Sequence, residues 1–160
     1  MANERIPMSR EGYEKLKAEL ERMETVEMIA VTKRIAAARD LGDLSENAEY
    51  HAAREDQGLL NARINELKSR LSHAYLVDPS AIKSDGAAFG AVVKVIDLDL
   101  DMEETFHLVG PGEEDYDRNR ILVSSPIGQA LLGKKVGQVA EVQAPMGKIR
   151  FKITEISFAG

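Results

Sequence analysis

The chain has 160 residues and a formal net charge of -6, and its composition excludes several classes of protein. Hydrophobic residues make up 44% and charged residues 30%, a balance that allows a packed core and argues against disorder. The negative charge argues against a protein that coats nucleic acid, because such binding needs an excess of Lys and Arg. The absence of cysteine excludes disulfides and thiolate metal sites. Neither a secretory leader pattern nor a membrane-length apolar run is visible, so we expect a cytoplasmic protein without membrane contact.

The first half of the chain has the pattern of a long helical hairpin. A first helix is predicted over residues 9–39 with Ser9 as its N-cap, and a second apolar pattern runs over residues 53–74 at steps of three, four and seven. The stripe of the first helix slips between Met23 and Met28, which a local change of winding accommodates. Each arm has about 30 residues, so the hairpin is on the order of 45 Å long. A short connection forces two such helices to pack antiparallel, as a coiled coil.

The composition changes at Asp78–Pro79, where we place a boundary between a hairpin domain, residues 1–78, and a second domain, residues 79–160. β-branched residues dominate beyond it, and strands are predicted over residues 89–98, 104–109, 121–123, 139–143 and 148–157. Ser125 and Pro126 are predicted to open one short helix, with Gly133 closing it. Met146 and Gly147 lie where a hairpin turn belongs. The predicted fold class is therefore α+β, with a coiled-coil hairpin followed by a mainly antiparallel β domain.

Motifs for catalysis or tight metal binding are scarce in this sequence. The three histidines are far apart and have no zinc-ligand spacing. Asp97, Asp99 and Asp101 imitate the first ligands of a calcium loop, but Met102 stands where the turn glycine belongs. We therefore favour a charged hairpin turn at this place.

The stretch 41–50, Leu-Gly-Asp-Leu-Ser-Glu-Asn-Ala-Glu-Tyr, separates the two predicted helices. Gly42 ends the first helix, and Asp43 with Glu46 has the spacing of a capping box, worth about 0.5–2 kcal/mol. The same carboxylates, with Glu49 close by, are also suited to bind Mg²⁺, which keeps several waters and shares its coordination with phosphates or another protein. The residues alone favour the cap. A metal-binding tip of this kind would complete another protein's active site rather than form one.

Four basic residues lie towards the tip end of the two arms. These residues are Lys33, Arg34, Arg39 and Arg54. Their charges suit either a nucleic-acid phosphate backbone passing nearby or ordinary solvation, and the sequence does not decide between the two interpretations.

Residues 42–55, Gly-Asp-Leu-Ser-Glu-Asn-Ala-Glu-Tyr-His-Ala-Ala-Arg-Glu, closely resemble the signature of bacterial transcript cleavage factors of the GreA/GreB family. The resemblance extends along the chain, through residues 7–9 with Gly12, residues 89–91, 109–110, 125–127 and 132–133. Residues 50–55 and the modest number of basic residues near the tip look more like the GreA branch of the family than the GreB branch.

The resemblance implies a mechanism in which the chain is not itself an enzyme. It implies that the hairpin enters the secondary channel of bacterial RNA polymerase and stimulates cleavage of the 3' end of a backtracked transcript. On this view Asp43 and Glu46 are the catalytic and metal-binding pair, holding a Mg²⁺ ion that is shared with the polymerase active site. The free protein is expected to bind no metal tightly and to act as a monomer.

The resemblance also assigns contacts and the fold of the second domain, which is expected to be FKBP-like. Contacts with RNA or the channel wall are implied for Arg39, Asn47, Tyr50 and Arg54, and docking on polymerase is implied for Ser125 and Pro126. Ser124 stands where the family often has Asp or Asn, so we expect the docking contact to be weaker or differently made.

Two alternatives to a cleavage factor stay open. One is a related factor that occupies the channel and inhibits polymerase, although the intact spacing of Asp43 and Glu46 argues against it. The other is a structural coiled-coil adaptor in which the tip carboxylates only cap a helix.

Overall fold

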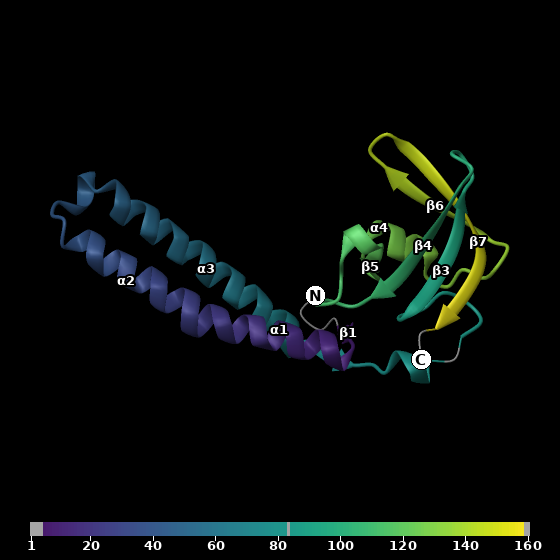
Figure 1. Ribbon diagram of the computed structural model, residues 1–160, viewed down its shortest axis with the longest axis horizontal. Helices are drawn as coiled ribbons and strands as arrows, with labels where there is room; N and C mark the ends of the chain where they lie inside the picture. The colour runs from purple at the N-terminus through teal and green to yellow at the C-terminus, as the bar shows by residue number, and fades with distance from the viewer. Residues whose placement is uncertain (1–4, 83, 159–160) are drawn as a thin grey trace. The chain divides into compact units, whose positions relative to one another are not determined.

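The computed structural model describes residues 5–82 and 84–158, which divide into two compact units (Figure 1). The first unit comprises residues 14–74 and contains most of the helical hairpin. The second combines residues 5–13 with the chain from Tyr75 onwards and contains the main β-sheet. The predicted α+β fold class is confirmed by the order of helices and strands. In the described part of the chain, no helix has the length and apolar character needed to cross a membrane.

The hairpin consists of two arms, and α2 and α3 lie side by side in Figure 1. The first arm runs through α1 (Arg10–Arg22), a π-helical turn (Met23–Glu27) and α2 (Met28–Arg39), so the predicted end near Arg39 is confirmed. The second arm is α3 (Ala48–Ser72). Both arms bury a stripe of apolar side chains along their contact: Met23, Val31, Ile35, Ala38, Ala53, Leu60, Ile64 and Leu67. Ion pairs between the arms, at 2.8 Å for Arg34–Asp56 and 3.2 Å for Lys68–Glu24, are consistent with antiparallel packing.

The slip of the apolar stripe coincides with the π-helical turn. A π-helical turn holds more residues than an α-helical turn, so it shifts the following residues around the helix axis. Met23 and Val31, on either side of the shift, are both 9% exposed, whereas Val26 within the turn is 62% exposed. The predicted change of winding is therefore confirmed, and it keeps the stripe facing the other arm.

The second unit is built on a five-stranded sheet with the order β5-β4-β3-β7-β6. Its strands are β3 (Ala91–Asp97), β4 (Met102–Val109), β5 (Arg120–Leu122), β6 (Val139–Ala144) and β7 (Gly147–Phe158). The predicted antiparallel pairing holds for β3 with β4, β3 with β7, and β6 with β7, whereas β5 pairs parallel to β4. The short α4 (Pro126–Leu131) lies between β5 and β6 in the chain, and β1 (Ile6–Met8) with β2 (Ala74–Leu76) forms a separate pair.

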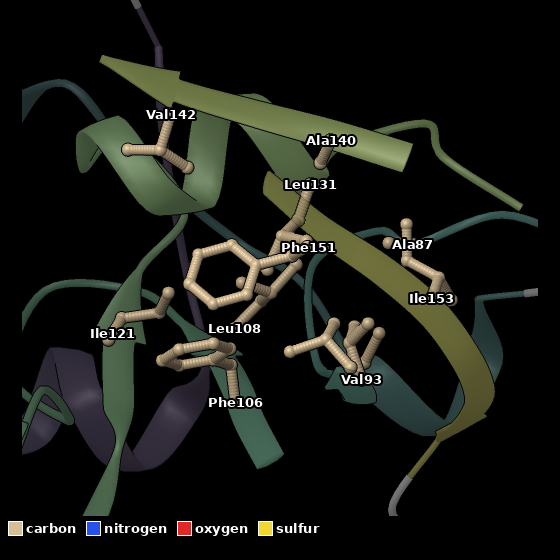
Figure 2. Close-up of a cluster of buried hydrophobic side chains, with 12 residues drawn as sticks. Ala87, Val93, Phe106, Leu108, Ile121, Leu131, Ala140, Val142, Phe151 and Ile153 are labelled. Carbon is tan, nitrogen blue, oxygen red and sulfur yellow. The ribbon is translucent and has the colours of Figure 1, made fainter. Parts of the chain in front are cut away.

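The core of the second unit lies between one face of the sheet and α4 (Figure 2). In β3 alternate residues are buried, as expected for a strand with one face towards the core. Val93 pairs in register with Phe106, whose ring meets that of Phe151 edge-on at 5.5 Å. Leu131 of α4 is fully buried against this group. Burying each such large apolar side chain stabilises the folded state by about 1.5–3 kcal/mol relative to leaving it exposed to water.

The turn between β3 and β4 confirms the predicted charged hairpin. The Asp97 carboxylate is almost fully buried and accepts the backbone N–H groups of Asp99 at 2.9 Å and Leu100 at 3.1 Å. Among residues 5–82 and 84–158, no three His, Cys, Asp or Glu side chains are grouped so that they could hold a metal ion. The aspartates therefore have a structural explanation.

The first turn of α1 belongs to the second unit, and it packs closely against the loop that contains Pro111 and Gly112. Ser9 caps the helix as predicted, because its Oγ accepts the Gly12 N–H at 3.0 Å. A Cβ atom on Gly12 would lie 2.7 Å from the Pro111 carbonyl oxygen, and a Cβ on Gly112 would lie 2.6 Å from the Gly12 carbonyl oxygen. Only glycine permits this backbone approach.

Two glycine-to-alanine substitutions in helices should therefore have opposite effects. Gly58→Ala, in α3 with open space around the glycine, should raise the free energy of unfolding by about 0.5–1 kcal/mol because alanine favours the helix. Gly12→Ala should lower it by about 1–3 kcal/mol because the new methyl group meets the backbone of Pro111. Urea unfolding followed by circular dichroism measures both. A stabilising Gly12→Ala would contradict the close contact.

Candidate functional site at the hairpin tip

The tip is the connection between α2 and α3, and it contains a helix end, a single 3-10 turn and a new helix start. Gly42 adopts a φ of +118°, which confirms the predicted break. The 3-10 turn comprises Leu44–Glu46, and Asn47 precedes the first residue of α3. The side chains from Leu41 to Glu46 are exposed.

Asp43, the predicted N-cap of the second long helix, does not cap α3. Asp43 Oδ1 accepts two bonds from Ser45, from the backbone N–H at 3.0 Å and from Oγ–H at 2.8 Å, so it caps the 3-10 turn. The N-cap of α3 is Asn47, whose Oδ1 accepts the Tyr50 N–H at 3.0 Å. The capping-box prediction is wrong because the 3-10 turn intervenes, which leaves Glu46 before α3 rather than inside its first turn. The two carboxylates are therefore not needed to start the long helix.

The hydrogen bonds from Ser45 fix the state of the Asp43 carboxylate. They hold its pKa below the usual range, first through the Ser45 side chain and then through its backbone N–H. Both bonds go to Oδ1, and within the described residues no hydrogen bond reaches Oδ2. Asp43 is therefore ionised at neutral pH and keeps one oxygen available to a ligand.

The donors at the tip fit a partly coordinated Mg²⁺ ion. Carboxylate oxygens are the ligands that Mg²⁺ prefers, and Asp43 and Glu46 both expose them. Two carboxylates supply only part of an octahedral Mg²⁺ shell. The tip therefore suits an ion whose remaining ligands come from another molecule.

The predicted contact residues fall into two groups. The Arg39 guanidinium lies 6.0 Å from the centre of the Tyr50 ring, and Tyr50 meets the His51 ring edge-on at 5.6 Å. His51 Nε2 lies 3.3 Å from the Ser45 carbonyl oxygen. By contrast, Arg54 donates to Gln57 Oε1 at 3.2 Å, one turn further along α3. Of the four basic residues near the tip, Arg39 is the one whose contact with an aromatic ring, that of Tyr50, is among the contacts described.

The Ser125–Pro126 pair has a local structural role in the second unit. Ser125 Oγ accepts the Gly128 N–H at 3.0 Å and donates to the Leu122 carbonyl at 2.7 Å, so its hydroxyl is used in capping α4. Pro126 and Ser124 are exposed. The surface available to a partner is therefore the backbone turn and the proline ring rather than the Ser125 hydroxyl.

Sequence reasoning missed Ser45, which determines how Asp43 is held. The pattern Asp-x-Ser indicates a turn in which the aspartate accepts bonds from the serine. The same pattern recurs at Asp78, whose Oδ1 accepts Ser80 N–H at 3.0 Å and Oγ–H at 2.6 Å. Its pKa is lowered for the same reasons. The turn is thus recognisable in sequence, but it does not by itself indicate function.

A cavity of about 660 Å³ lies in the second unit, lined in part by Phe89, His107, Glu113 and Arg120. Arg120 donates to the Glu113 carbonyl at 3.0 Å and to its carboxylate at 3.3 Å, while its Nη1 lies 3.3 Å from His107 Nδ1. Glu113 also accepts a hydrogen bond from Ser9. These four polar residues therefore form one connected network, which ties the start of α1 to the sheet.

The comparisons with known proteins cover almost the whole chain. Residues 6–76 match the family model for the N-terminal part of transcription elongation factors, and residues 82–158 match the model for the C-terminal part of GreA/GreB factors. Transcription elongation factor GreA of Thermodesulfovibrio yellowstonii is 52% identical over 97% of this chain and 98% of its own length. The GreA of Rhodospirillum rubrum is 47% identical over 97% and 99%.

Solved structures similar to the chain include GreA factor homolog 1 (Gfh1) of Thermus thermophilus. It is 28% identical with a TM-score of 0.45, covering 96% of this chain and 99% of that one. The matches along the sequence define the class of protein, a transcription elongation factor. The chain belongs to the GreA/GreB family of these factors. The resemblance found in its sequence is thereby confirmed.

Removing the Ser45 hydroxyl should raise the pKa of Asp43. Ser45→Ala keeps the backbone N–H but loses the bond that lowers this pKa most, so the value should move towards the ordinary one of about 3.9. Because the folded pKa is the lower one, the associated stability is present above the unfolded value and disappears as pH falls through the folded value. NMR titration of the Asp43 carboxyl carbon measures the shift. Ser80→Ala is the matched control, and it should change Asp78 alone.

The cavity network predicts a pH-dependent stability through His107. Burial, followed by the nearby Arg120 charge, lowers the pKa of His107, and Glu113 opposes this only in part. Below about pH 6.5 the unfolded chain therefore binds the proton more readily, so stability should fall as pH decreases from 7.5 towards 5.5. His107→Gln should reduce this dependence in urea unfolding. An unchanged dependence would mean that His107 does not cause it.

Proposed function

We propose that this chain stimulates the Mg²⁺-dependent cleavage of RNA by bacterial RNA polymerase, with its hairpin tip inserted into the secondary channel. The observation that carries the proposal is the pair of exposed carboxylates, Asp43 and Glu46, with the outer oxygen of Asp43 uncommitted. Membership in the GreA/GreB family supports it. In this role the protein works in the cytoplasm, where polymerase is found, and acts as a monomer on the 3' end of a backtracked transcript.

The tip would contribute part of a metal site rather than a whole one. Asp43 and Glu46 would hold a Mg²⁺ ion together with polymerase ligands and RNA phosphate, and such an ion activates water and stabilises charge during phosphodiester hydrolysis. The Ser45 hydrogen bonds favour the ionised form of Asp43 and engage only its Oδ1, which leaves Oδ2 for a ligand. The chain alone would bind Mg²⁺ weakly. It would therefore activate polymerase without being a nuclease itself.

The predicted contacts have different roles in this proposal. Arg39, Tyr50 and Arg54 lie close to the tip, where a guanidinium suits phosphate and an aromatic ring suits a base or the channel wall. Pro126 and the α4 turn that Ser125 caps would dock on polymerase through the second unit. Asn47 differs from these residues because both polar groups of its side chain are paired within the hairpin.

Cleavage of RNA in a stalled elongation complex tests the proposal. With Mg²⁺, the wild-type chain should release short 3' fragments, and Asp43→Ala or Glu46→Ala should reduce release by roughly 100-fold or more because a metal ligand is lost. Competition binding to polymerase should remain nearly unchanged in both variants. Glu14→Ala, which removes an exposed carboxylate of α1, is the matched control and should cleave like wild type.

Each other outcome supports a different function. Normal cleavage by both variants would exclude the metal role. Binding by the wild type that only slows elongation would indicate a channel inhibitor. A failure to bind polymerase would leave the structural adaptor as the better explanation.

A further inference from the structure

The half-buried side chain of Asn47 uses both of its polar groups at the base of the tip. Its Oδ1 accepts the Tyr50 backbone N–H at 3.0 Å, and its Nδ2 donates to the Ala38 carbonyl at 2.6 Å. The orientation of the amide follows from these partners, because one is a donor and the other an acceptor. We propose that Asn47 is a positioning residue, which joins the end of α2 to the start of α3 and thereby sets where Asp43 and Glu46 are presented.

The bond to Ala38 closes the acidic connection into a loop. Ala38 and Asn47 are nine residues apart, and both tip carboxylates lie between them in the chain. The backbone of Asn47 adds two bonds: its N–H donates to the Leu44 carbonyl at 3.4 Å, and its carbonyl accepts the His51 N–H at 3.1 Å. One residue thus connects α2, the 3-10 turn and α3. The side chains between residues 41 and 46 are exposed, and the other described contact of this segment with α3 is the 3.3 Å approach of His51 Nε2 to the Ser45 carbonyl oxygen.

The chemistry of asparagine suits this double role better than that of the other common caps. An N-cap needs only an acceptor, so Ser and Asp cap helices about as well as Asn. An aspartate has no donor for the Ala38 carbonyl. A serine Oγ is bonded directly to Cβ, so a serine that caps α3 at this position reaches less far towards the Ala38 carbonyl than the Asn47 amide nitrogen does. The bond between the arms therefore depends on the amide, whereas the cap does not.

Asn47 differs from the other residues predicted to contact RNA or the channel, because its side-chain amide already has hydrogen-bond partners within the hairpin. Its Oδ1 and Nδ2 are already paired within the hairpin, so its effect on cleavage should come through the shape of the loop. The effect of Asn47 on cleavage rests on the proposed function. Its effect on the order of the loop does not, because that order can be measured in the free protein without polymerase.

Asn47→Ser tests the inference because it keeps the cap and removes the reach to Ala38. In the free full-length chain, NMR order parameters for residues 40–46 should fall towards about 0.6, while the unfolding midpoint stays close to that of wild type. Asn65→Ser, the same change at an exposed position of α3, is the matched control and should leave the loop unaltered. Unchanged loop order in Asn47→Ser would overturn the inference.

The cleavage assay provides the second readout. At saturating factor, the maximal rate with Asn47→Ser should fall roughly tenfold or more, because the ligands are misplaced. The concentration for half-maximal stimulation should change little, whereas loss of a binding contact would raise it. A disordered loop with an undiminished maximal rate would overturn the positioning role. If wild type stimulates no cleavage at all, the proposed function fails, and the order parameters still decide whether Asn47 closes the loop.

Discussion

The tip depends on the apolar seam between the two arms of the hairpin. Long helices in water gain most of their stability from packing, and exposed ion pairs such as Arg34–Asp56 add only about 0–1 kcal/mol. Near the tip the seam is made of two small residues, Ala38 and Ala53, which are 3% and 1% exposed. Small side chains let helices approach closely. This approach brings the Ala38 carbonyl within reach of Asn47 and makes the closed loop possible.

The polar side chains of the tip divide their tasks so that the carboxylates are left exposed. Asn47 starts α3 and joins the arms, and Ser45 holds Asp43 by one oxygen. Neither set of hydrogen bonds involves the Glu46 carboxylate. The same Asp-x-Ser turn at Asp78 shows that local chemistry alone does not create a functional site. What distinguishes Asp43 is its place on an exposed loop at the end of two long helices.

Sequence patterns predicted the features that depend on local chemistry. Gly42, Ser9 and the Ser125–Pro126 pair behave as their residue types require, and the slipped stripe indicated the π-helical turn. The cap of α3 was misplaced because Asp43 and Asn47 are both good caps four residues apart. Choosing between them requires knowing that a 3-10 turn uses the first. The parallel pairing of β5 and the bond from Asn47 to Ala38 arise from tertiary contacts, which no periodicity encodes.

The close approach of Gly12 to Pro111 has a consequence for anyone who wishes to divide this protein or exchange its parts. The second unit is assembled from two separated stretches, and Met8, from the first of them, is fully buried. A fragment that starts after the hairpin would lack this stretch and expose the surface that it covers. A chimera with a relative's hairpin must therefore keep residues 5–13 from the parent of the β-sheet. The arms are, in effect, an insertion into the sheet unit rather than a segment placed before it.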